Sequence, residues 1–132
     1  MIGMKKIHIA LIGLMAVALV AGLVVTFSGK ASGGIPAYAT RHPLVKEAYM
    51  FAVENPGALD GVNCYCGCMH HPHDGRVHSR GLLDCYRTAD GGFDRHASEC
   101  DMCIMDALQV KEMTAQGKTK DEIKRYIDGK YT

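Results

Sequence analysis

The sequence predicts a small, mainly α-helical domain that follows one hydrophobic N-terminal segment. Three observations predict this: an uncharged apolar run near the N-terminus, helical spacing of apolar residues at both ends of the remaining chain, and no alternating strand pattern of four or more residues. The part after the apolar run has about 93 residues, which corresponds to one domain. Because so small a domain buries only a modest core, we expect cross-links or metal ions to stabilise it further.

The first element is the apolar run over residues 7–27, which contains no charged side chain. A helix of about 20 residues spans the hydrocarbon core of a bilayer, so this run predicts a single-pass membrane anchor over residues 1–27. Lys5 and Lys6 precede it, and the positive-inside rule then places the rest of the chain on the extracytoplasmic side of the cell membrane. The alternative is a cleaved signal sequence, for which Ala-Tyr-Ala at 37–39 offers a site.

Residues 28–42 are rich in Gly, Ser and Ala, which predicts a flexible linker. The domain of residues 43–132 then begins with a helix, because Pro43 suits a first helical turn and an Asn-Pro-Gly sequence ends the periodic pattern. Leu44 and Phe51 are expected on the buried face of this helix.

The remaining segments are a central loop and two C-terminal helices. Six Gly and Pro residues over 57–82 predict irregular structure, followed by one helical turn at 82–86. We expect the next helix to begin with Ser98 as its N-cap. Thr119 and Glu122 have the spacing of a capping box, which predicts the start of a last helix.

The six cysteines carry the predicted chemistry. Three of them fall within five residues, around Gly67, and a C-x-x-C pair follows at the start of the predicted long helix. Neighbours at i and i+2 form a disulfide only in a strained ring, whereas this spacing suits sulfurs that converge on one ion. His96 lies four residues before Cys100 and is the best nitrogen ligand. The predicted metal ligands are Cys64, Cys66, Cys68, Cys85, His96, Cys100 and Cys103.

The expected cargo of this site is copper or zinc. Thiolate-rich sites suit Zn²⁺, Cu(I) and iron–sulfur clusters, and we rank the cluster below the single ions. Four ligands complete a tetrahedral zinc site, so seven candidates allow two ions or a cluster. Two alternatives stay open: a disulfide-stapled interaction domain, because the expected compartment is oxidising, and an electron-transfer or thiol-redox protein that uses the C-x-x-C pair.

Histidines and methionines near the cysteines are secondary candidates. A solvated polar loop is the simplest interpretation of the histidines that follow the triple cysteine motif, although as a group they can form a weaker or transfer site; they are His70, His71, His73 and His78. Met69 and Met102 can offer thioether sulfur to Cu(I), whereas Met105 is expected to pack in the core.

Composition excludes several other functions. Residues 40–132 hold 12 of the 15 basic residues and all 14 acidic ones, a net charge of −2, which argues against nucleic acid as a partner. The chain has no nucleophile elbow, P-loop or dinucleotide-binding motif. We therefore predict no catalytic residue and favour metal sequestration or delivery over an enzymatic role; the protein partner is open.

Four segments of the chain read NCYCGC, LLDCY, RHASECDMCIMDAL and GKTKDEIKRYIDGKY. In these segments the chain resembles the PCYCGC-motif family over about residues 43–132. The resemblance implies a small bacterial extracytoplasmic protein, in a family with many lipoproteins and no established function, and the same cysteine and histidine set. Asn63 stands where the motif has proline, which should loosen the start of the loop. The chain also lacks a lipobox cysteine, so anchoring would fall to the apolar run.

Overall fold

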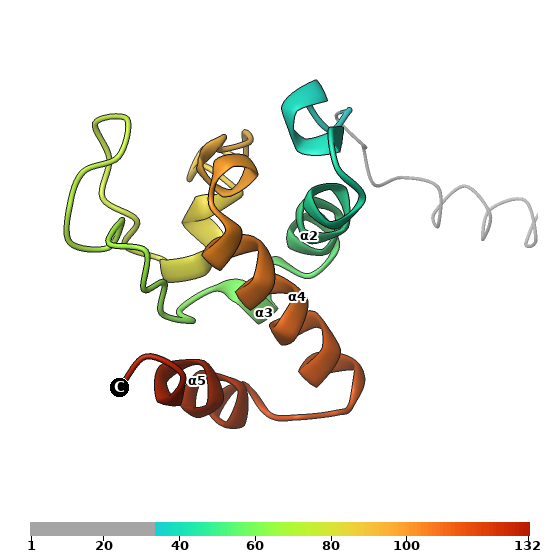
Figure 1. Cartoon of the computed structure of the whole chain (residues 1–132), viewed down its shortest axis with the longest axis vertical. Coiled ribbons are helices and arrows are strands. Elements are labelled where there is room, and N and C mark those ends of the chain that lie inside the picture. The colour runs from blue at the N-terminus through green and yellow to red at the C-terminus, as the bar shows by residue number, and fades with distance from the viewer. Residues whose placement is uncertain (1–33) are drawn as a thin grey trace, which may run out of the picture. The chain divides into compact units, whose positions relative to one another are not determined.

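The computed structural model describes residues 34–132, in which helices flank an irregular central segment (Figure 1). These residues contain no β-strand, only two isolated bridges, which agrees with the predicted mainly helical domain. None of the helices among them is long and apolar enough to cross a membrane, and the predicted anchor lies outside the described residues. The helices are α2 (Pro43–Glu54), α3 (Pro56–Leu59), α4 (Asp101–Ala115) and α5 (Lys120–Gly129); the 3₁₀ turns are η1 (Ala37–Thr40), η2 (Gly81–Cys85) and η3 (His96–Glu99).

Helix α2 starts at Pro43, as predicted, with His42 as its N-cap. The His42 side chain accepts a hydrogen bond from the Leu44 backbone N–H at 3.3 Å. The predicted buried face was wrong at Leu44, which is 43% exposed, because the face that meets the core runs through Val45 and Tyr49 instead. Phe51 is buried, as expected.

The turn η1 belongs to the fold, although the sequence predicted a flexible linker there. Ala39 is fully buried, and the ring of Tyr38 meets the ring of Tyr49 edge-on with centroids 6.1 Å apart. Apolar contact of this kind with α2 holds the segment in place. A composition rich in small residues does not reveal this contact.

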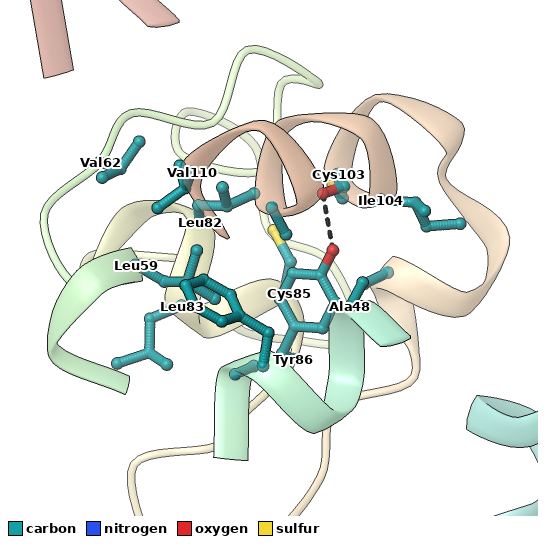
Figure 2. Close-up of a cluster of buried hydrophobic side chains, with 14 of the residues drawn as sticks. Ala48, Leu59, Val62, Leu82, Leu83, Cys85, Tyr86, Cys103, Ile104 and Val110 are labelled. Atoms are coloured by element: carbon teal, nitrogen blue, oxygen red, sulfur yellow. Dashed lines mark hydrogen bonds between the residues drawn. The ribbon is translucent and has the colours of Figure 1, made fainter. Parts of the chain in front are cut away.

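The core lies between α2, α4 and η2 and is centred on two buried tyrosines. Tyr49 and Tyr86 pack edge to face with centroids 4.9 Å apart. The Tyr86 hydroxyl donates to the Cys103 backbone carbonyl at 2.6 Å, the dashed line in Figure 2, where Cys85 is drawn in the same cluster. The core therefore fixes the positions of two of the cysteines directly.

Helix α4 begins two residues later than the sequence predicted. Ser98 lies in η3, and Cys100 is the N-cap of α4, because its extended backbone (φ −129°, ψ 102°) separates the turn from the helix. Met105, predicted to pack in the core, is 56% exposed on the outer face of α4, so that prediction was wrong.

Helix α5 has the predicted capping box. Thr119 accepts from the Glu122 backbone N–H at 3.3 Å, and the Glu122 carboxylate accepts from the Thr119 backbone N–H at 2.8 Å. The fully buried carboxylate of Asp106 on α4 accepts from Lys130 Nζ at 2.5 Å and from the Tyr131 hydroxyl at 3.0 Å, which ties the residues after α5 to α4.

The central segment is held to the helices by a close backbone contact at Gly81. This glycine has φ +68°, and the Leu82 N–H donates to the Val62 carbonyl at 2.8 Å. A Cβ at position 81 would lie 2.1 Å from that carbonyl oxygen. The contact sets η2, and with it Cys85, against the chain that leads into the cysteine loop.

We predict that Gly81→Ala destabilises the domain much more than Gly75→Ala does. Gly75 also has a positive φ (+77°) but open space around its Cα, so alanine there pays only the left-handed backbone penalty of about 1 kcal/mol. Alanine at 81 adds a clash with rigid backbone, and we expect a loss of at least about 3 kcal/mol. Urea unfolding of the two variants measures the difference; equal losses would show that the close approach is unimportant.

Candidate metal centre

The triple cysteine motif curls so that its sulfurs face one another. Gly67, at φ +96°, allows the tight turn. The Sγ atoms of Cys64 and Cys66 are 3.1 Å apart, and those of Cys66 and Cys68 are also 3.1 Å apart. All six cysteines of the chain are free thiols.

Two further elements add sulfur to the same cluster. Cys85, at the end of η2, has its Sγ 3.6 Å from that of Cys64 and 3.7 Å from that of Cys68. Cys103, in the first turn of α4, has its Sγ 3.6 Å from that of Cys64 and 3.8 Å from that of Cys66. Segments 39 residues apart in the sequence thus meet at one point.

The sulfur spacing suits a metal ion. With metal–sulfur bonds of about 2.3 Å, sulfurs at the corners of a tetrahedron are about 3.8 Å apart. The contacts that Cys85 and Cys103 make, at 3.6–3.8 Å, are close to this value. The ligand atoms of Cys64, Cys66, Cys85 and Cys103 all lie within 4.8 Å of one another, so these four residues can hold one ion.

The nitrogen candidate His96 reaches this cluster as well, with Nε2 3.2 Å from Cys66 Sγ. Two more sets of four ligand atoms within 4.8 Å contain it: one with Cys66, Cys100 and Cys103, the other with Cys66, Cys68 and Cys85. Cys66, the central residue of the triple cysteine motif, belongs to every set. The structure therefore brings all seven predicted ligands into one group of overlapping sets.

The position of His96 depends on the buried residue Asp94. The Asp94 carboxylate accepts from the His96 backbone N–H at 2.7 Å and also pairs with the Arg76 guanidinium. Its backbone carbonyl accepts from the Tyr49 hydroxyl at 2.7 Å. One buried residue thus links the ligand segment to the helix α2, and Arg76 neutralises its charge.

Hydrogen bonds between the thiols lower the pKa of some cysteines and raise the pKa of others. A hydrogen bond from the Cys85 thiol lowers the pKa of Cys66 to about 4, and one from Cys103 lowers the pKa of Cys100 to about 7. Hydrogen bonds from Cys103 and its neighbours likewise lower the pKa of Cys64. The same contacts, with burial, raise the pKa of Cys85, which acts as donor. Part of the cluster is thus already in the thiolate form that metals bind.

The histidine that sequence reasoning misjudged is His78. It was expected in a solvated loop, but it is 1% exposed and its Nδ1 lies 3.4 Å from Cys85 Sγ. Its backbone N–H donates to the Cys68 carbonyl at 3.0 Å, which folds the end of the loop under the cluster. The sequence offered one sign of its burial: His78 lies just before the predicted helical turn at 82–86. His70 and His71 are exposed, as predicted.

Of the predicted thioether donors, Met69 lies at the cluster. Its Sδ accepts a hydrogen bond from the Cys64 backbone N–H at 3.1 Å, so it orients the start of the cysteine loop. Met69 also lines an open pocket of about 280 Å³ over this loop with Asn63, Tyr65 and His70.

The family model described as a protein of unknown function with PCYCGC motif matches residues 28–132, which include every described residue. The chain belongs to the PCYCGC-motif family. No curated protein and no solved structure matches it.

The sequence suggested that Asn63, in place of the motif's proline, loosens the start of the loop, but the structure shows it tied down. Its side chain donates to Asp128 at 2.9 Å, and the Tyr65 hydroxyl donates to the same oxygen at 2.8 Å. Asn63 therefore fastens the motif to α5.

We predict that Cys66 of the reduced, metal-stripped protein reacts first with iodoacetamide and stays reactive at pH 6. It is partly exposed, and a thiol with a pKa of about 4 is ionised at pH 6, where an ordinary thiol of pKa about 8.5 is less than about 1% ionised. Cys85, buried and with a raised pKa, should react last. Pulsed labelling with peptide mass spectrometry measures the order; Cys66 labelling that falls about tenfold per unit below pH 8 would contradict it.

Proposed function

We propose that this protein binds copper or zinc in the cysteine cluster and sequesters or delivers the ion outside the cytoplasm. The observation that carries this proposal is the convergence of three separate segments, the triple motif, η2 and the start of α4, on overlapping four-ligand sets around Cys66. A domain that needed cysteines only for packing would have no reason to place charged thiolates in contact with one another, because burying them costs free energy unless they are paired or bind metal.

The donor chemistry supports a soft cargo. Thiolates dominate every set, and the nitrogen of His96 is compatible with both zinc and copper. More donors are present than the four of a closed tetrahedral site, so the donors outside the occupied set are available to exchange with those inside it.

The exposure pattern supports delivery. Cys64, Cys85 and Cys103 are buried, whereas Cys66 and Cys100 are only partly covered. An ion in the cluster is thus shielded on one side and can be reached by incoming ligands on the other. Exchange of ligands through a partly exposed thiolate is how an ion passes to a partner without entering water.

We expect Cys66→Ser to lower metal binding and stability together. Serine keeps the size but binds soft metals poorly, and all three ligand sets lose a member. Metal binding contributes on the order of 10 kcal/mol to folding in small zinc domains, so the melting temperature of the loaded protein should fall with metal content. Cys103→Ser should behave similarly, because it belongs to two of the sets.

The matched control for these variants is His71→Ala, which changes an exposed residue of the adjoining loop. Elemental analysis and thermal unfolding of the full-length chain, purified reduced and loaded with Zn²⁺ or Cu(I), give both quantities. Full metal retention in Cys66→Ser, or a loss as large in His71→Ala, would place the site on other residues.

We further propose that the domain is held at the outer face of the cell membrane by the apolar segment at residues 7–27. The support is the uncharged run with Lys5 and Lys6 before it. Protease added to intact spheroplasts should then cut the chain, which should fractionate with membranes. Cleavage only after lysis would contradict the orientation, and a mature N-terminus at Thr40 would contradict the retained anchor.

A further inference from the structure

Three imidazole rings gather at one edge of the cysteine cluster. The ring centroids are 4.2 Å apart for His73 and His96, 5.2 Å for His78 and His96, and 6.2 Å for His73 and His78. Imidazoles bound through nitrogen to one tetrahedral ion, with bonds of about 2 Å, have centroids about 5 Å apart. The three centroid distances bracket this value, so the rings are close enough together to share an ion once each turns one nitrogen toward it.

Two ring nitrogens in this group are buried without a hydrogen bond. His78 is 1% exposed and uses Nδ1 toward Cys85, while its Nε2 finds no partner among the described residues. The same holds for Nδ1 of His73, whose nearest carboxylate oxygen, on Asp74, is 3.6 Å away. A buried polar atom left unpaired costs about 1–3 kcal/mol, so such atoms in a native fold call for a partner, either water or an ion.

We propose that His73, His78 and His96 form a second metal site, which takes a borderline divalent cation through nitrogen donors. Imidazole suits Zn²⁺, Cu²⁺ and Ni²⁺, whereas the thiolates of the cysteine cluster suit Zn²⁺ and Cu(I). The site shares one wall with the proposed cysteine centre, because His96 also touches Cys66. Its other two ligands belong to none of the cysteine sets.

The surroundings suit a cation at this place. The guanidinium of Arg76 pairs with the adjoining Asp94 carboxylate, which neutralises its positive charge. The side chain of His73 is 43% exposed, so a cation from solvent can reach the trio. The buried sulfur of Cys85 lies 3.4 Å from Nδ1 of His78.

Anaerobic Co²⁺ titration of the full-length reduced chain in mild detergent tests the site. Cobalt bound to thiolate gives intense near-ultraviolet charge-transfer absorption, whereas cobalt bound to imidazole gives only weak visible bands. We expect His73→Ala to bind about one Co²⁺ fewer per chain, with the charge-transfer absorption unchanged. His71→Ala, an exposed histidine outside the trio, is the matched control and should titrate like the unaltered chain.

Two further variants separate this site from the cysteine centre. His78→Gln should lose the same ion as His73→Ala, provided that circular dichroism shows the fold intact. Cys103→Ser should lower the charge-transfer absorption and keep the weak bands. Unchanged stoichiometry and spectrum in His73→Ala would overturn the histidine site alone. Weak bands without any charge-transfer absorption in the unaltered chain would overturn the cysteine centre and leave the histidine site standing.

Discussion

The contact of sulfur atoms around Cys66 is the interaction on which the central part of this domain depends. The segment between α3 and α4 has little regular secondary structure, so few repetitive backbone hydrogen bonds hold it. Instead the loop of Cys66, the turn η2 and the start of α4 meet through their thiols. A bound ion would turn weak contacts between partly charged sulfurs into strong bonds that join these segments.

The scaffold holds this cluster through a small number of buried polar contacts. Tyr86 fixes the carbonyl of Cys103, and Tyr49 fixes that of Asp94, which in turn positions His96. Both tyrosines are fully buried and touch each other, so one aromatic pair in the core supports both the sulfur side and the nitrogen side of the site. Asn63 adds the link to α5. The buried residues of the core therefore also hold the cysteines and His96 in place.

Local signals in the sequence predicted the parts of the structure that depend on local physics. Pro43 at a helix start and the Thr119 capping box act within one turn, and the spacing of the cysteine motif allows few other arrangements. The errors came from tertiary contacts. Leu44 and Met105 have helical spacing but face away from the core, because neighbouring elements choose the buried face. His78 looks like a loop residue until the loop folds under Cys85.

X-ray absorption at the K-edge of the bound metal tests the central claim most directly, because it reports the atoms around the ion without any substitution. For the full-length protein loaded with one equivalent of Zn²⁺, we predict a first shell dominated by sulfur at about 2.3 Å, with at most a minority of nitrogen at about 2.0 Å. A first shell of nitrogen and oxygen alone would contradict the account, because it would mean that the ion does not bind to the cysteine cluster.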